Sequence, residues 1–227
     1  GSNHRVFDSV RGSSKILYPS LTDTEATDAA GLTSFNSNGF SIGSNSINDS
    51  GAAFVAWQWK AGGTAVTNTS GTISSQVSAN PTAGFSIVTW TGNGSSSATV
   101  GHGLGAVPAM IICKERSGTD YWHVKHKSTA SNTNLYLNVQ LASTSAASVG
   151  DGVLSDLSSS TTFGFATAGS PGNVVAVNEN GVTNVAYCWS EISGFSKFGT
   201  YTGNGSSDGP FIYCGFKPRW IMIKCSS

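Results

Sequence analysis

An internal repeat constrains this chain more than any other feature. Residues 84–86 (Gly-Phe-Ser) recur at 194–196, and residues 91–96 (Thr-Gly-Asn-Gly-Ser-Ser) recur at 202–207. Further matches continue each set in order: Pro108, Ile111 and Lys114 with Pro218, Ile221 and Lys224, and Asn48, Gly51, Val55, Ala56 and Trp59 with Asn178, Gly181, Val185, Ala186 and Trp189. Because order and local spacing are kept, chance is a poor explanation, and the repeat predicts two copies of one structural unit.

The two sets of matches divide the chain into one complete module and two halves of another. Residues 84–193 hold both sets and predict a complete module B, whereas residues 194–227 hold only the opening half and residues 1–60 only the closing half of a module A. Residues 61–83 are predicted to be a linker or an edge strand. Half a module has unpaired strand edges and half a core, so the two halves are expected to dock. Docking within one chain is the preferred interpretation, and head-to-tail docking between neighbouring chains is the alternative.

Short apolar runs separated by turn residues predict an all-β fold. Strands are expected at 54–59, 85–90, 110–113 and 135–139, which are rich in strand-forming residues, and 73–78 is a candidate edge strand within the 61–83 segment. Asn-Gly pairs suited to hairpin turns follow at 38–39, 93–94, 180–181 and 204–205. One short helix is predicted at 22–30, where Thr22 and Glu25 fit a capping box and Gly31 a stop signal. The expected architecture is antiparallel β-sandwich modules in two related copies.

Charge argues against several classes of partner. The 227 residues include 12 Lys and Arg and 12 Asp and Glu, so the net charge is +0, and only 11% of residues are charged. Nucleic-acid binding needs clustered positive charge, as does attachment to an anionic membrane surface. No apolar run approaches the roughly 20 residues of a membrane span, and no leader peptide is visible. We therefore expect no nucleic-acid partner and no membrane insertion.

The sequence offers weak signals for catalysis or metal binding. The four cysteines, Cys113, Cys188, Cys214 and Cys225, form no Cys-x-x-Cys pair and are predicted to be free thiols. His123 and His126 are three residues apart and would point to opposite faces of a strand, which disfavours a shared metal. No nucleophile elbow is present, and the acidic residues are scattered, so neither a hydrolase triad nor a glycosidase pair is indicated. We expect no enzyme activity, no metal and no cofactor.

Three acidic residues and one glycine-rich stretch also have plain structural interpretations. Asp23, Glu25 and Asp28 are interpreted as the polar face of the short helix rather than as calcium ligands. Residues 101–105 (Gly-His-Gly-Leu-Gly) resemble a phosphate loop but lack its helix and its Lys, so a hairpin loop is predicted.

Aromatic side chains supply the candidate ligand site. Trp57, Trp59 and Trp189 alternate along their segments and are predicted to pack in cores. Residues Tyr121, Trp122 and His123 lie beside polar loop residues. Flat aromatic faces stack on sugar rings while polar groups contact the hydroxyls, so these three are the candidate ligand-binding residues.

The repeated string resembles a known family. Gly-Phe-Ser, then Tyr/Trp-Thr-Gly-Asn-Gly-Ser, then Gly-x-x-Pro-x-x-Ile-x-Lys is similar to a repeat domain of tailed-bacteriophage virion proteins, including predicted tail fibres of environmental phages. Residues 7–12 (Phe-Asp-Ser-Val-Arg-Gly) and 34–40 (Ser-Phe-Asn-Ser-Asn-Gly-Phe) extend the resemblance over nearly the whole chain.

This resemblance implies a structural protein of the virion, assembled in the host cytoplasm, that forms part of a tail fibre or another surface appendage. The implied partners are other virion subunits and further copies of the chain, with a host-surface glycan as a candidate receptor. It transfers no catalytic or binding residue. The alternatives are a non-catalytic carbohydrate-binding module and a polysaccharide-degrading tail enzyme.

Overall fold

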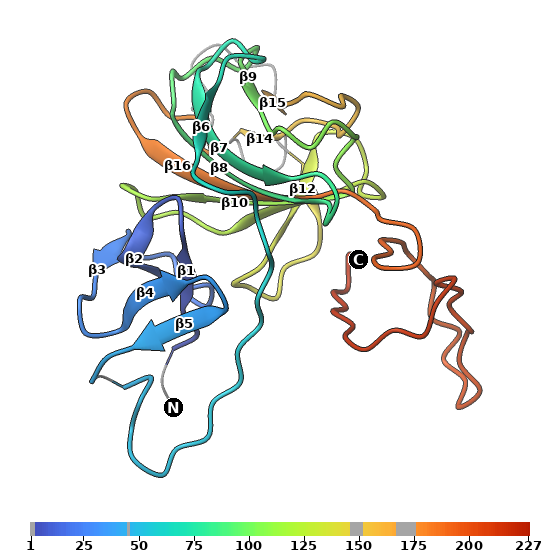
Figure 1. The fold of residues 1–227 in the computed structure, drawn as a ribbon. Coiled ribbons are helices and arrows are strands. Elements are labelled where there is room, and N and C mark those ends of the chain that lie inside the picture. Colours follow the sequence, from blue (N-terminus) through green and yellow to red (C-terminus); the bar gives the residue numbers. More distant parts are fainter. Residues whose placement is uncertain (1–2, 45, 146–151, 167–175) are drawn as a thin grey trace.

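The computed structural model describes residues 3–44, 46–145, 152–166 and 176–227, and its centre is one eight-stranded sheet (Figure 1). The strand order is β13-β12-β11-β10-β16-β8-β7-β6, and all neighbours are antiparallel. The strands are β6 (Val66–Asn68), β7 (Ser75–Asn80), β8 (Phe85–Thr91), β10 (Met110–Glu115), β11 (His123–His126), β12 (Thr133–Tyr136), β13 (Thr144–Ser145) and β16 (Thr183–Trp189). The described residues form no helix, and the prediction of an antiparallel all-β fold is confirmed.

Strand β16 lies at the middle of this sheet, between β10 and β8. It pairs along its whole length, and Trp189 lies opposite both Met110 and Phe85. Its side chains alternate between two buried clusters, because Ala186 and Cys188 face one and Val185 and Tyr187 face the other. Burial of both faces explains why the strand is a nearly continuous apolar run rather than an alternating one.

A second, smaller sheet covers one face. It consists of β14 (Val153–Leu154), β15 (Thr162–Ala166) and β9 (Thr99–Gly101), in that order. Phe163 and Phe165 of β15 pack against Trp90 of β8, with ring centroids 5.4 and 6.1 Å apart. The two layers enclose the first buried cluster, as expected for a sandwich.

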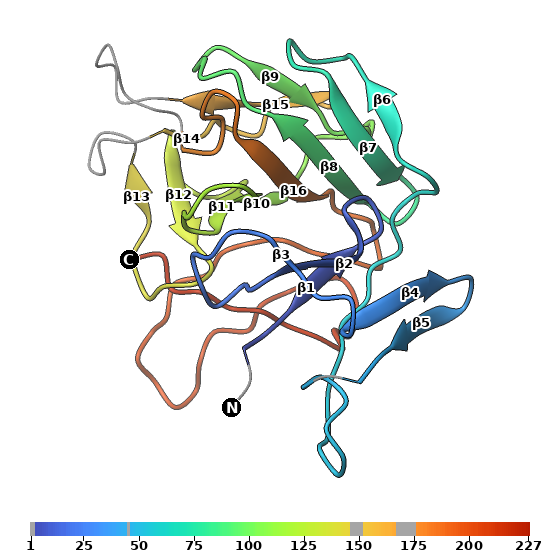
Figure 2. The ribbon, with the colours of Figure 1, turned by 90° about the vertical axis from the view of Figure 1, so that its left-hand side faces the viewer.

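The N-terminal strands cover the other face. Strands β1 (Val6–Asp8), β2 (Gly12–Leu17) and β3 (Ala26–Thr27) form a three-stranded sheet below the main one (Figure 2). Leu17 enters the second buried cluster beside Ile87 and Trp122. A separate hairpin, β4 (Leu32–Asn36) and β5 (Gly39–Ile42), turns at Ser37 and Asn38, so Gly39 of the predicted Asn-Gly pair is already the first residue of β5.

The predicted helix at 22–30 is wrong, because this segment instead lies extended and contains β3. The backbone N–H of Glu25 donates to Arg116 O at 2.7 Å, and that of Asp28 donates to Ser14 O at 2.8 Å. Two turns of isolated helix are marginal in water, so these bonds to distant strands prevail.

The structure also differs from the sequence at two other segments. The strand expected at 54–59 does not form, and Trp57 and Trp59 are exposed rather than in a core, because the segment has no neighbouring strand. The segment at 73–78, predicted to be an edge strand or part of a linker, overlaps β7 (Ser75–Asn80), which is an internal strand because β6 pairs with its outer edge.

The predicted modules are therefore not both visible in one chain. The folded unit that contains residues 84–193 also includes β6, β7 and the N-terminal sheet, so it extends beyond the predicted module B. Residues 194–227 form no strand, apart from an isolated bridge between Ile192 and Ser196, and run as exposed coil (Figure 1). Among the described residues, no strand pairing joins residues 1–60 to residues 194–227.

Two isoleucines that match in the repeat test this difference in burial. Ile111 is fully buried in β10, whereas its counterpart Ile221 is exposed. In dilute protein we expect Ile111→Ala to lower the free energy of unfolding by about 2–5 kcal/mol, the usual cost of emptying a core site. Ile221→Ala should change it by less than about 0.5 kcal/mol. Urea denaturation measures both, and equal losses would contradict the structure.

Candidate functional site

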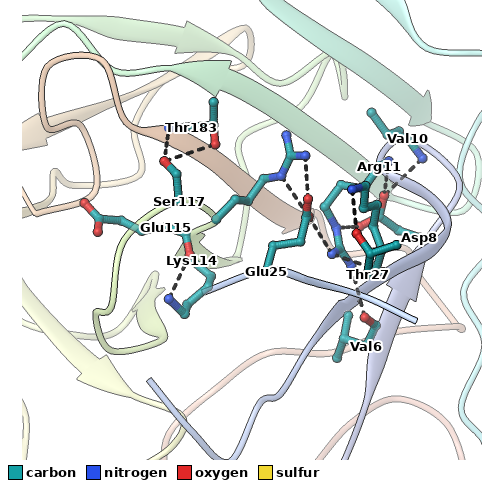
Figure 3. A network of polar contacts seen from close by, with 12 residues as sticks. Val6, Asp8, Val10, Arg11, Glu25, Thr27, Lys114, Glu115, Ser117 and Thr183 are labelled. Atoms are coloured by element: carbon teal, nitrogen blue, oxygen red, sulfur yellow. Dashed lines mark hydrogen bonds and ion pairs between the residues drawn. The ribbon is translucent and has the colours of Figure 1, made fainter. Parts of the chain in front are cut away.

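A buried polar network joins the N-terminal sheet to the main sheet (Figure 3). Arg11, in the turn between β1 and β2, pairs with Asp8 of β1 through Nε, and its Nη2 donates to the hydroxyl of Tyr187 on β16 at 3.2 Å. The Tyr187 hydroxyl in turn donates to Asp8 Oδ2 at 2.7 Å. The aspartate also holds its own turn, because the backbone N–H groups of Val10 and Arg11 donate to its Oδ1.

Glu25 extends the network to β10. Its carboxylate accepts two hydrogen bonds of 2.9 Å from the guanidinium of Arg116, and it pairs with Arg11 Nη1 at 3.0 Å. Burial by itself would raise the pKa of Glu25, but the hydrogen bonds from Arg116 and Arg11 outweigh it and hold the pKa below its usual 4.5. The carboxylate is therefore charged at neutral pH, and it joins the segment before β3 to the turn before β2 and to the end of β10.

The electrostatics of the network suit a fixed junction. Burial opposes the charge of Arg11, yet Tyr187 and Asp8 more than compensate and raise the pKa of the guanidinium. Burial also raises the pKa of the Tyr187 hydroxyl well above its usual value. Neither the Arg11 guanidinium nor the Tyr187 hydroxyl changes protonation near neutral pH, which suits a network that stabilises an interface.

The three predicted ligand-binding residues occupy different environments. Trp122 is buried in the second cluster, where its Nε1 donates to Tyr18 O at 3.0 Å. Tyr121 is 40% exposed, and its ring centroid lies 5.0 Å from that of Tyr136. Of Tyr121 and Trp122, only Tyr121 is exposed to solvent. Ligand binding at Tyr121 remains a prediction.

His123 is held inside the protein by polar neighbours. Its Nε2 lies 2.8 Å from Asp120 Oδ2, and its Nδ1 lies 3.1 Å from the side-chain amide of Asn134. Both ring nitrogens are thus engaged, and the ring is buried. The His123 ring packs against the Tyr136 ring, with centroids 5.2 Å apart, and is not exposed at the surface.

Two buried lysines were missed at the level of sequence. Lys114 Nζ donates to the carbonyls of Glu115 at 2.7 Å and Gly118 at 3.2 Å, and burial lowers its pKa. Lys125 Nζ donates to Ala130 O at 3.0 Å. Both tie loops to strands. For Lys114, its recurrence as Lys224 in the repeat was the sequence feature that could have indicated a structural role.

The remaining reactive groups are dispersed. All four cysteines are free thiols, and burial raises the pKa of Cys188 to about 12. Within the described ranges, no three His, Cys, Asp or Glu side chains gather where they would hold a metal ion. A pocket of about 430 Å³ beside β6 and β7 is lined by uncharged residues, among them Thr67, Asn68 and Gly103.

Comparison with known proteins gives the family. A family model described as "Domain of unknown function (DUF7483)" matches residues 1–227. The chain belongs to the DUF7483 family. Searches of curated proteins and of solved structures found no match. In the part of this DUF7483 chain that the structure describes, no helix has the length and apolar character to cross a membrane.

The Glu25 carboxylate predicts a defined pH dependence. Its lowered pKa means that it stabilises the fold at neutral pH, and that this contribution is lost as the pH falls through the lowered pKa. Glu25→Gln should therefore lower the free energy of unfolding at pH 7 by about 1–3 kcal/mol, the range for charged hydrogen bonds. The deficit should shrink below pH 4.5. Urea titrations at several pH values measure this.

The matched control for this experiment is Glu179→Gln, because Glu179 is exposed. It should leave the stability within about 0.5 kcal/mol of the wild type at every pH. A Glu25→Gln deficit that stays constant down to low pH would show that the carboxylate charge is not what stabilises the junction.

Proposed function

We propose that this chain is a structural protein of a bacteriophage virion, a β-rich, non-catalytic module of a tail fibre or another surface appendage. The observation that carries the proposal is the structural role of the repeated string that begins with Gly-Phe-Ser and ends with Gly-x-x-Pro-x-x-Ile-x-Lys, here called the signature. The string that resembles those of phage virion proteins occurs twice in the chain, and its first copy, within residues 84–114, builds strands β8 and β10 of the main sheet.

Individual signature residues support this interpretation. Gly84 has a positive φ of 64°, and a Cβ there would lie 2.5 Å from Ser190 O, so the turn before β8 requires glycine. Trp90 is buried against β15. Asn93 accepts a 3.0 Å hydrogen bond from Asn178, which connects the turn after β8 to the approach to β16. A signature devoted to folding is what a repeated structural module requires.

Host attachment is the second candidate role, and the exposed ring of Tyr121 favours it. The Tyr121 side chain is 40% exposed, and its ring lies 5.0 Å from that of Tyr136 at a tilt of 53°, which suits contact with a sugar ring. Binding on a glycan array without any virion would favour a carbohydrate-binding module instead. Release of reducing sugar from host polysaccharide would favour a degrading enzyme.

Electron microscopy with gold-labelled antibodies raised against this chain tests the proposal directly. We expect the label on purified virions of a phage that encodes the chain, at the tail fibres or another appendage, and none with pre-immune serum. Labelling confined to host material, with bare virions, would rule out a virion component.

A further inference from the structure

Three segments of the chain correspond in the repeat to strands of the main sheet but belong to no sheet of this structure. Residues 53–59 correspond in the repeat to β16, and residues 195–201 and 220–225 correspond to β8 and β10. In these segments Val55 is 82% exposed, Trp57 61%, Ile221 66% and Ile223 65%. Their counterparts in the sheet, Val185, Tyr187, Ile111 and Cys113, are buried. A protein that leaves strand-forming apolar segments bare has surfaces suited to association.

The repeat also specifies how these segments fit together. In the folded sheet, β16 lies between β8 and β10, with Trp189 opposite Met110 and Ala186 opposite Cys113. Carried through the repeat, this register places Trp59 opposite Trp220 and Ala56 opposite Ile223. Because a shift of one residue would reverse every side chain, the register is a specific prediction.

One contact of this register already exists, but it goes no further within the chain. The rings of Trp59 and Trp220 meet edge to face, with centroids 6.0 Å apart. Beyond Trp220, Lys224 Nζ donates to Val139 O at 3.1 Å, and Ser143 N donates to Ser226 O at 3.1 Å. These bonds hold residues 224–226 near the end of β12, which β11 and β10 separate from β16.

We propose that residues 53–59 of one chain form the central strand between residues 195–201 and 220–225 of a second copy. Main-chain hydrogen bonds would supply the pairing and the repeat register its specificity, as in other strand-addition complexes. Since each chain carries both halves, the contact is head to tail and can grow into a row of copies. The inference goes beyond the proposed function and does not depend on a virion.

Disulfide trapping between two chains tests this contact. In a background of Cys214→Ser and Cys225→Ser, one chain carries Ala56→Cys, and a second, size-tagged chain carries Ile223→Cys. Paired Cα atoms in an antiparallel ladder lie about 4.5–5.5 Å apart, within the range of a disulfide. After mild oxidation, we expect the mixed dimer to exceed either homodimer about fivefold or more on a non-reducing gel.

The matched control replaces Ala56→Cys with Ala52→Cys, which is also exposed and lies four residues, or about 13 Å, further along the strand. It should give no excess of mixed dimer. Equal trapping by Ala52→Cys and Ala56→Cys, or no mixed dimer at all, would overturn the proposal. So would a disulfide that forms only when Ala56→Cys and Ile223→Cys share one chain, since that outcome means closure within the chain.

Discussion

The burial of β16 on both faces and both edges is the constraint on which the rest of the structure depends. Its hydrogen bonds to β8 and β10 fix the centre of the main sheet, and its alternating side chains fill two separate clusters. A strand with two apolar faces needs two covering layers. The sheet β14-β15-β9 supplies one and the N-terminal sheet supplies the other.

The two covers are attached by different means. The first packs aromatic rings against Trp90, and apolar packing of this kind tolerates some variation in position. The second adds a buried network in which Arg11 contacts Asp8, Glu25 and Tyr187 together. Buried ions are costly to desolvate, so they stabilise only one arrangement well. This network therefore orients the N-terminal sheet on the main one.

Local patterns were sufficient to predict β8 and β10, because both are apolar runs bounded by turn residues and both find partners nearby in the fold. They failed at 22–30, where Arg116 and Arg11 draw Glu25 into an ion pair from distant positions. They failed at 54–59 because a strand needs a partner as well as a propensity. For the candidate site, position along the chain indicated the exposure of Tyr121 but not the burial of Trp122 and His123, which depends on the N-terminal sheet and β12.

We propose that the repeat encodes a second copy of the β8-β16-β10 centre, whose strands, residues 53–59, 195–201 and 220–225, pair only between chains. Amide hydrogen exchange, followed by mass spectrometry at low and high protein concentration, tests this claim most directly. The account predicts that residues 183–189 exchange slowly at both concentrations, whereas residues 53–59 exchange rapidly in dilute protein and slowly in concentrated protein. Equal protection of residues 53–59 at both concentrations, or rapid exchange of 183–189, would contradict it.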